Sequence, residues 1–269
     1  MRWLTPRSVD EALQIKADAP DAVVIAGGTF LGILMRHGLI EAESWLSLQH
    51  VPELTQLSCA AELSIGAMVR HRRLELDPEI RRHWPGVAQA FEAVASPRVR
   101  NVATAGGVLA DADYASDPPS MLVALGAWVE AASLTGIRRI PVSDLIIGHY
   151  ETRLADDELI TKIVVPRGAT QAVYRRLCTR TAEDRPCVSV SAVSASGTLR
   201  VVVGAVSDKP QYFPDVCERF DSSDRASAAE LAAGYADLID PISDVRGSAD
   251  YRRRVVAVEV RRALEELAA

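Results

Sequence analysis

Two pairs of adjacent glycines stand out because small residues and a threonine flank each of them. The first pair lies in Ala26-Gly27-Gly28-Thr29, directly after the apolar run Val23-Val24-Ile25. The second lies in Thr104-Ala105-Gly106-Gly107, and mostly small residues continue from there to Asp117. Glycine has no Cβ atom, so its backbone can approach a ligand closely, and successive backbone N–H groups can hold an anion. Two loops of this composition predict a clamp for a diphosphate, and hence a nucleotide cofactor.

Neither loop matches the usual nucleotide-binding patterns. The dinucleotide fingerprint has glycines at its first, third and sixth positions, and a phosphate loop ends in Gly-Lys followed by Ser or Thr. Both patterns are absent from the sequence. A cofactor is therefore expected on a scaffold other than the doubly wound fold. A plain glycine turn remains the alternative for either loop taken alone.

The segments around these loops resemble the FAD-binding (medium) subunit of the molybdenum hydroxylases, the family of xanthine dehydrogenase and carbon monoxide dehydrogenase. The similar segments are residues 99–104 through 124–127, residues 157–161 with 165–166, Arg176, Arg180 and Asp184, and residues 240–248 with 251–253. The resemblance covers the whole chain. It implies an α+β fold, with a two-lobed FAD-binding domain of the xanthine dehydrogenase/vanillyl-alcohol oxidase type. A small C-terminal domain of the carbon monoxide dehydrogenase flavoprotein type, with a three-stranded antiparallel sheet and helices, would follow.

The resemblance also implies which residues hold a noncovalent FAD. The residues carried over are Ala26, Gly27, Gly28, Thr29, Phe30, Leu31, Ala103, Thr104, Gly106, Gly107, Ala112, Ser116, Asp117, Leu159, Ile160 and Arg176. The glycines and threonines of both loops would hold the diphosphate, and Gly107 is expected to need a positive φ. Asp117 would accept hydrogen bonds from hydroxyls of the sugar or ribityl chain. The backbone of Leu159 and Ile160 would pass close to the isoalloxazine edge.

Four positions depart from the pattern of the family. Arg176 stands where relatives usually have a lysine, and its charge would stabilise the N1–C2=O edge of a reduced flavin; a solvated strand residue is the alternative. Val108 replaces a polar residue, Phe30 replaces another, and Tyr114 stands where proline is frequent. These three side chains either weaken FAD binding or form a stacking surface for it.

The function implied is that of an electron-transfer subunit. FAD would pass electrons from the iron–sulfur centres of a small subunit to NAD or another acceptor. A large molybdopterin subunit would carry the molybdenum cofactor, and the [2Fe–2S] clusters would also lie on partner chains. A free-standing or diverged flavoprotein, or a scaffold subunit, is the alternative. No catalytic residue and no metal ligand are assigned to this chain.

Composition supports these expectations. The formal net charge of −6 argues against a nucleic-acid partner, because binding its backbone needs a basic surface. The four cysteines contain no Cys-x-x-Cys pair, which argues against a metal or iron–sulfur cluster held by this chain alone. No apolar run approaches the ~20 residues of a membrane span, and the N-terminus lacks a secretory pattern. A cytoplasmic location is therefore expected.

Patterning predicts the elements that position the loops. Ser8 and Glu11 indicate a helix cap, and the apolar residues of 81–95 are typical of one helix that packs on the core. Strands are expected at 172–177, 188–193 and 199–206, and helices at 226–236 and 249–267. We expect lobes at 1–56 and 57–167, then a C-terminal domain at 168–269 after the linker 166–168. Arg176, Arg180 and Asp184 would share one face of a strand.

Overall fold

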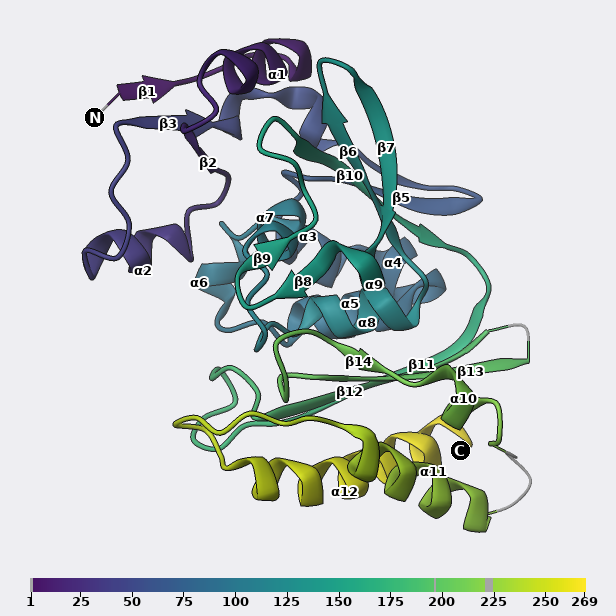
Figure 1. Ribbon diagram of the computed structural model, residues 1–269. Coiled ribbons are helices and arrows are strands. Elements are labelled where there is room, and N and C mark those ends of the chain that lie inside the picture. The colour runs from purple at the N-terminus through teal and green to yellow at the C-terminus, as the bar shows by residue number, and fades with distance from the viewer. Residues whose placement is uncertain (1, 196, 221–224) are drawn as a thin grey trace.

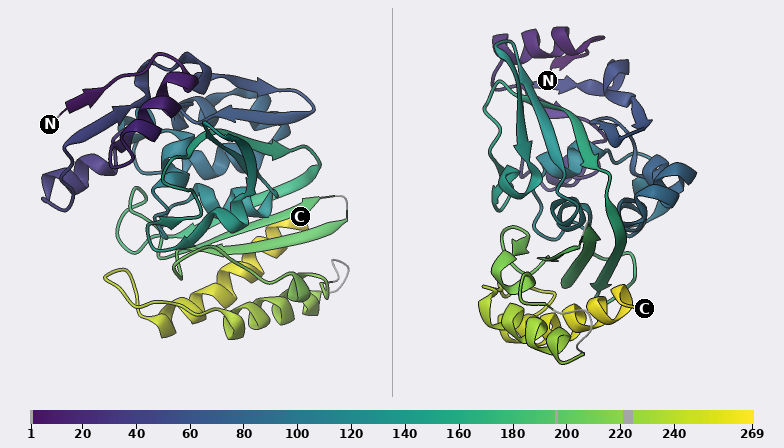
Figure 2. Two further views of the ribbon diagram at one scale, coloured as in Figure 1. Left: turned by 45° about the horizontal axis from the view of Figure 1, so that its top comes forward. Right: turned by 90° about the vertical axis from the view of Figure 1, so that its right-hand side faces the viewer.

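The computed structural model describes residues 2–195, 197–220 and 225–269. Its strands form three main sheets, with helices between them and on their outer faces (Figure 1). The N-terminal sheet and the C-terminal helices lie at opposite ends of the molecule, and the views of Figure 2 agree on this. Helices and strands occur together in the N-terminal and in the C-terminal part of the chain, which confirms the predicted α+β class.

The first sheet is parallel and small. Its order is β1 (Arg2–Leu4), β3 (Ser44–Ser47) and β2 (Val23–Ile25). Helix α1 (Val9–Asp18) begins at the predicted cap, where the Ser8 hydroxyl accepts from the Glu11 N–H at 3.1 Å. Helix α2 (Leu31–Arg36) has no buried residue. The short 3₁₀ turns η1 (Leu48–His50) and η2 (Pro52–Thr55) lead to the second sheet.

The second sheet is antiparallel and supports the second glycine loop. Its order is β4 (Leu57–Cys59), β5 (Glu62–Gly66), β10 (Leu159–Pro166), β6 (Trp128–Ser133) and β7 (Gly136–Pro141). The helices of this region are α3 (His71–Leu76), α4 (Pro78–His83), α5 (Pro85–Glu92), α6 (Pro97–Arg100), α7 (Ala105–Ala110), α8 (Pro118–Ala124) and α9 (Val142–Leu145). A small hairpin follows, made by β8 (Ile146–Gly148) and β9 (Glu151–Thr152).

The prediction of one helix over residues 81–95 is wrong. Helix α4 ends at His83, Trp84 is non-helical with φ −136° and ψ 55°, and α5 begins at Pro85. Proline has no N–H to donate to the preceding turn and disfavours a helical residue before it, so the chain turns there. The apolar periodicity still marks the buried face, because Val87, Ala88 and Phe91 are all in the core.

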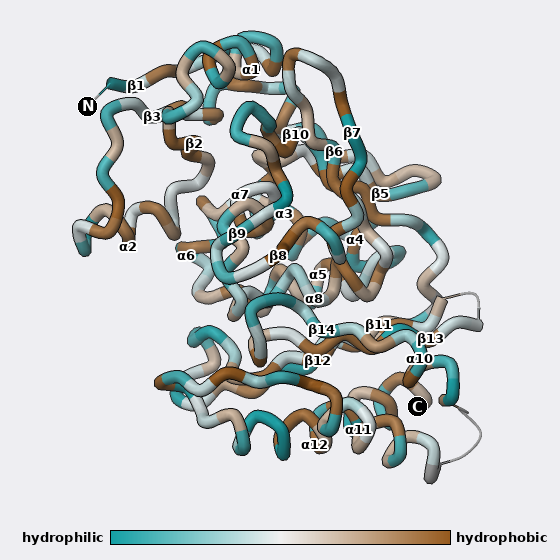
Figure 3. The backbone as a smooth tube through the Cα atoms, in the orientation of Figure 1, coloured by the Kyte–Doolittle hydropathy of each residue, from teal (hydrophilic) through white to brown (hydrophobic). Residues whose placement is uncertain are grey.

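The third sheet lies between the two groups of helices. Its antiparallel order is β11 (Ala169–Leu177), β12 (Val188–Ala195), β13 (Thr198–Gly204) and β14 (Gln211–Tyr212). The three predicted strands are therefore present, and the short β14 adds a fourth within the described residues. Helix α10 (Pro214–Cys217) leads to α11 (Arg225–Leu238) and α12 (Ala249–Leu267), which cover one face. Hydrophobic and hydrophilic residues alternate along the visible tube of α12 (Figure 3).

The other face of the third sheet packs on the FAD-binding region expected from the sequence. Helix α8 lies against β12 and β13, where the hydroxyls of Ser120 and Ser191 are 3.0 Å apart. The indole N–H of Trp84 donates to the Pro166 carbonyl at 3.1 Å, beside the start of β11. The described helices include none that is long and apolar enough to cross a membrane.

A buried ion pair fixes the segment that leads into the second glycine loop. The guanidinium of Arg100 contacts the Glu75 carboxylate at 2.8 Å, and both side chains are less than a tenth exposed. Arg100 also donates to the carbonyls of Val94 and Ala95, each at 2.9 Å. Burial raises the pKa of Glu75, but hydrogen bonds from Arg100 and Arg72 outweigh it, so the pKa is lowered.

We expect Arg100→Met to lower the free energy of unfolding by about 3 kcal/mol, because it leaves the buried Glu75 charge largely uncompensated. Arg72→Met is the matched control, since the Arg72 side chain is 37% exposed. It should cost about 1 kcal/mol or less. Urea denaturation of both variants measures the difference, and equal costs would contradict the assignment.

The same pair predicts a pH dependence. The pKa of Glu75 is lowered in the folded chain, so the stabilisation is complete above the unfolded pKa and is lost as the pH falls through the folded pKa. The gap in stability between the wild-type chain and Arg100→Met should therefore narrow in acid. Denaturation curves at neutral pH and near pH ~3 test this. A gap that stays constant would show that Glu75 is not the titrating group.

Candidate functional site

The two glycine loops line one cavity of about 540 Å³. This volume is within the range of about 300–1,000 Å³ that is usual for small-molecule and cofactor sites. Of the sixteen residues predicted to contact the cofactor, the following line the cavity: Ala26, Gly27, Gly28, Thr29, Phe30, Leu31, Ala103, Thr104, Gly106, Gly107, Ser116, Asp117, Leu159 and Ile160. Ala112 and Arg176 are not part of its wall.

The first loop presents free backbone donors to the cavity. Within the described part of the chain, the N–H groups of Gly27, Gly28, Thr29 and Phe30 donate no hydrogen bond. Gly28 has φ +66° and Phe30 has φ −83°, so left-handed and right-handed residues lie close together and can turn successive N–H groups toward one point. The positive φ that was predicted at Gly107 is found here, at Gly28.

The second loop uses its N–H groups internally. The Gly106 N–H donates to the Ala67 carbonyl at 2.8 Å, and the Gly107 N–H donates to the Thr104 hydroxyl at 3.2 Å, which caps α7. Gly107 lies in the first turn of α7 with a negative φ, so the reason given for it from the sequence is wrong. A Cβ atom on Gly107 would lie 2.8 Å from the Thr104 hydroxyl and would disturb this cap.

The two loops contact each other through bare backbone. A Cβ atom on Gly27 would lie only 2.3 Å from the Val102 carbonyl oxygen, which no real side chain tolerates. Gly106 packs as tightly on Ala67 at the end of β5, where an added Cβ would lie 2.6 Å from the Ala67 Cβ. Gly27 therefore joins the loop after the first sheet to the segment before α7, and Gly106 joins α7 to the second sheet. The sequence pattern alone did not reveal these contacts.

His71 supports the second loop from the core. Its ring Nε2 lies 3.1 Å from the Thr104 carbonyl, and its backbone N–H donates to the Ala103 carbonyl at 3.0 Å. Burial lowers the pKa of His71 to about 4, so the ring is neutral and Nε2 carries the proton. The histidine packs edge-on against Phe91 at 4.8 Å between ring centroids. Sequence reasoning assigned it no part in the site.

Asp117 in the cavity wall forms a buried ion pair with Arg176, which does not line the cavity. Arg176 Nη1 lies 2.9 Å from Asp117 Oδ1, and the Tyr174 hydroxyl donates to the same oxygen at 2.7 Å. Arg176 also donates to the carbonyls of Ala93 and Ala182. Burial raises the pKa of Asp117, and the charge of Arg176 opposes that shift. The guanidinium is thus engaged by protein groups, and its predicted contact with a flavin stays a prediction.

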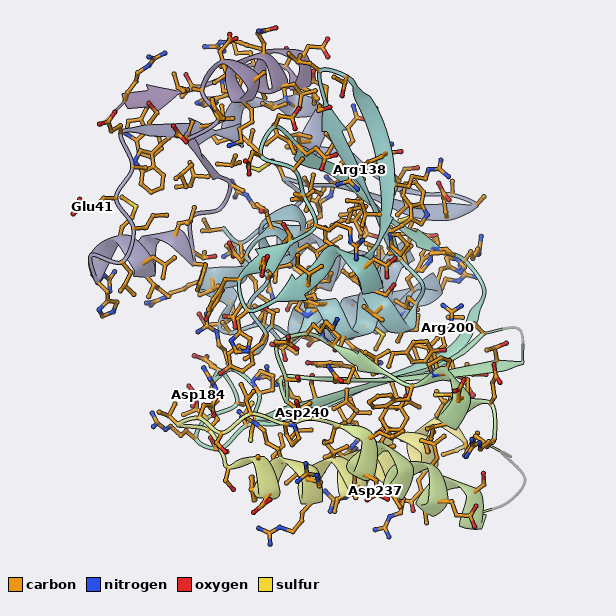
Figure 4. The ribbon with its side chains drawn as sticks, viewed as in Figure 1. Glu41, Arg138, Asp184, Arg200, Asp237 and Asp240 are labelled. Carbon is orange, nitrogen blue, oxygen red and sulfur yellow. The ribbon has the colours of Figure 1, made fainter. Side chains whose placement is uncertain are left out.

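Arg180, Asp184 and Arg176 were expected to share one face of a strand, and this prediction is wrong. Strand β11 ends at Leu177, and Arg180 and Asp184 lie on the following loop, where Figure 4 labels Asp184. The Asp184 carboxylate accepts from the Thr181 N–H at 3.2 Å. Arg180 and Asp184 nevertheless line the cavity, but from this loop and not from a strand.

An ion pair beside the cavity, between Arg185 and Asp113, was not predicted from the sequence. Arg185 Nη2 lies 2.7 Å from Asp113 Oδ2, although the N–H is not aligned as a hydrogen bond. Burial, together with the charge of Asp113, raises the pKa of Asp111 to about 7. Phe30 stacks on Tyr150, with ring centroids 5.4 Å apart, and Arg185 lies 5.8 Å from the Phe30 ring. Phe30 therefore stacks on another side chain of the protein, and a stacking surface for FAD at this position stays a prediction.

These features fit a dinucleotide with a diphosphate at its centre. The free N–H groups of the first loop can hold the anion. The apolar part of the wall includes Leu48, Leu154 and Leu159. Groups that could hold a metal ion through three or more His, Cys, Asp or Glu side chains are absent among the described residues.

Comparisons with known proteins identify the family of this chain. The family described as "FAD binding domain in molybdopterin dehydrogenase" matches residues 1–168, and the "CO dehydrogenase flavoprotein C-terminal domain" matches residues 168–267. The nicotine 6-hydroxylase medium subunit of Paenarthrobacter nicotinovorans is 33% identical over 100% of this chain and 98% of its own length. The carbon monoxide dehydrogenase medium chain of Hydrogenophaga pseudoflava is 28% identical, with 96% of this chain and 94% of that one covered.

Two solved structures also match the fold of this chain. Quinoline 2-oxidoreductase from Pseudomonas putida 86 superposes with a TM-score of 0.94 and 31% identity, over 100% of this chain and 96% of that chain. Carbon monoxide dehydrogenase from Hydrogenophaga pseudoflava has a TM-score of 0.93 and 26% identity, over 99% and 96%. Both matched regions, the full-length relatives and the shared fold identify one family. The chain belongs to the FAD-binding medium subunits of the molybdenum hydroxylases.

Proposed function

We propose that this chain is the FAD-carrying electron-transfer subunit of a multi-subunit hydroxylase. Bound FAD supplies the redox chemistry, and the protein supplies binding, orientation and electrostatics. Electrons would arrive from iron–sulfur centres of a small partner subunit and leave to NAD or another acceptor. A large partner subunit would hold the molybdenum cofactor and hydroxylate the substrate. The names of the relatives, a medium subunit and a medium chain, support this assembly.

The observation that carries the proposal is the row of free N–H groups on the first loop. Gly27, Gly28, Thr29 and Phe30 would hold the diphosphate through their backbone. The second loop would offer a close, uncharged surface at Gly106 and Gly107, and Thr104 would keep that surface in place through its cap on α7. Asp117 and Ser116 would face the sugar or ribityl hydroxyls, and Leu159 and Ile160 would cover an apolar part of the cofactor.

The proposed partners can be tested by co-purification at native expression level. A yellow chain that elutes with a large and a small iron–sulfur subunit supports the assembly. A yellow chain that elutes alone supports the alternative of a free-standing flavoprotein. Reduction of the complex with its substrate, followed by addition of NAD, then identifies or excludes NAD as the acceptor.

Gly28→Val should weaken FAD binding about 10- to 100-fold, because a β-branched residue at positive φ costs ~1–3 kcal/mol and would move the free N–H groups. Gly32→Ala is the matched control. Gly32 lies on α2 with no atom within 4 Å of an added Cβ, so its FAD affinity should equal that of the wild-type chain. Titration of the apoprotein with FAD measures both. Equal affinities for Gly28→Val and the wild-type chain would show that the loop is only a turn.

The FAD should be bound noncovalently. Among the residues that the structure describes, no cysteine lines the cavity and His71 is the one histidine that does. His71 is buried and bonded to the Thr104 carbonyl through Nε2. Acid precipitation of the purified protein should therefore release the yellow colour into the supernatant. Colour that stays in the pellet would refute this prediction.

Arg176→Met should lower the reduction potential of the bound flavin by about 30 mV, which is ~1.4 kcal/mol for a two-electron couple. Without Arg176, the negative charge of Asp117 would be uncompensated and would disfavour the anionic reduced form of the flavin. Adding Asp117→Asn to the same chain should restore much of the potential, since the pair is then removed as a whole. Redox titration of the three proteins tests this, and equal potentials would remove the pair from the electrostatics of the site.

A further inference from the structure

The loop between α7 and α8, residues 111–117, forms one wall of the cavity. Asp111, Asp113, Ala115, Ser116 and Asp117 line the cavity, but Tyr114 does not. Its side chain is half-buried, and its hydroxyl contacts Arg246, a residue of another part of the cavity wall. Tyr114 is also the residue at which the sequence departs from the proline frequent in the family. Tyr114 therefore acts on the site through its contacts with other parts of the protein.

Tyr114 is bonded to a carboxylate of the C-terminal region. Its hydroxyl donates to Asp244 Oδ2 and accepts from Arg246 Nη1 at 2.8 Å. Burial and the hydrogen bond to Asp244 raise the pKa of Tyr114 to about 12, so the hydroxyl keeps its proton. This contact joins two segments that are 130 residues apart in the chain.

Asp244 is itself held rigidly. Arg252, which is fully buried, contacts Asp244 Oδ1 at 2.8 Å, and Arg246 Nη1 contacts Oδ2 at 3.0 Å. The backbone N–H groups of Arg246 and Gly247 donate to Oδ1 at 2.7 and 3.3 Å. Burial favours the neutral acid, but hydrogen bonds from Tyr114, Arg246 and Arg252 outweigh it and lower the pKa of Asp244. Tyr114 is therefore attached to a charged and fixed anchor.

The rest of the wall is held from the same side. The His149 ring stacks on the Tyr114 ring, with centroids 4.9 Å apart and planes 15° from parallel. The Tyr150 N–H donates to the carbonyl of Ala112, a residue at φ +46°. At the far end of the loop, Asp117 is bonded to Tyr174 and Arg176 of β11.

We infer that Tyr114 is a positioning residue for FAD: through Asp244, the C-terminal region holds the 111–117 wall in the shape that binds the cofactor. This inference rests on the proposed function. The wall carries Ala112 at positive φ, and the like-charged Asp111 and Asp113 lie on either side of it, so backbone strain and charge repulsion would otherwise displace this segment. The hydrogen bond from Tyr114, which does not itself line the cavity, to the carboxylate of Asp244 opposes that displacement.

Tyr114→Phe is the sharpest test, because it keeps the ring and its stack on His149 and removes only the hydroxyl. Tyr251→Phe is the matched control. Tyr251 lies on α12 beside Gly247, outside the cavity, and its hydroxyl makes no hydrogen bond in the described part of the chain. FAD affinity is measured on the full-length apoprotein by titration. We expect about a tenfold weaker affinity for Tyr114→Phe, the loss of one hydrogen bond to a charged group, and no change for Tyr251→Phe.

Hydrogen exchange of the apoproteins separates positioning from general stability. Loss of the Tyr114 hydroxyl should speed exchange in residues 111–117 and leave the first glycine loop and β10 unchanged. A purely structural role would instead speed exchange in β11, β12 and β13 as well, because global opening exposes every element.

The outcomes are distinct. Weaker FAD binding with local loosening of 111–117 supports the inference. Unchanged FAD affinity in Tyr114→Phe, or loosening across the whole third sheet, overturns it. A wild-type chain that fails to bind FAD overturns the proposed function, and the inference with it.

Discussion

The contact between Gly27 and the Val102 carbonyl is the constraint on which the site depends. It allows no Cβ atom, because one would lie 2.3 Å from the carbonyl oxygen. The first loop ends a strand of the parallel sheet, and Val102 leads into α7 above the antiparallel sheet. The regions of the parallel and the antiparallel sheet, which share no strand pairing, therefore meet at this point. Any residue larger than glycine would separate them and open the floor of the cavity.

Three arginines beside the cavity are paired with carboxylates of the protein. Arg176 pairs with Asp117, Arg185 with Asp113, and Arg246 with Asp244. A paired cation contributes little net field, so these arginines shape the wall more than they attract an anion. Besides Arg180, which also lines the cavity, the groups that can meet a diphosphate are the N–H dipoles of the first loop. These dipoles carry no net charge and need no charged partner when the site is empty.

The sequence predicted the local features well and the long-range ones poorly. Period and turn residues identified the cap at Ser8, the three long strands of the third sheet and both glycine loops. The break at Trp84 was missed because apolar spacing continues across Pro85. The Asp117–Arg176 pair joins residues 59 positions apart. Composition marks both side chains as polar and cannot show that they are partners, so Arg176 was read as free to reach the flavin.

The C-terminal region therefore does more than support the FAD-binding region. From the sequence, Arg176 was its one expected contribution to the cofactor site. Yet Tyr174 and Arg176 hold one end of the 111–117 wall, and Asp244 holds its middle through Tyr114. Asp117 is 4% exposed, and a carboxylate so buried is tolerated only with partners. Both partners come from β11, so the wall of the FAD-binding region is complete only when the third sheet is packed against it.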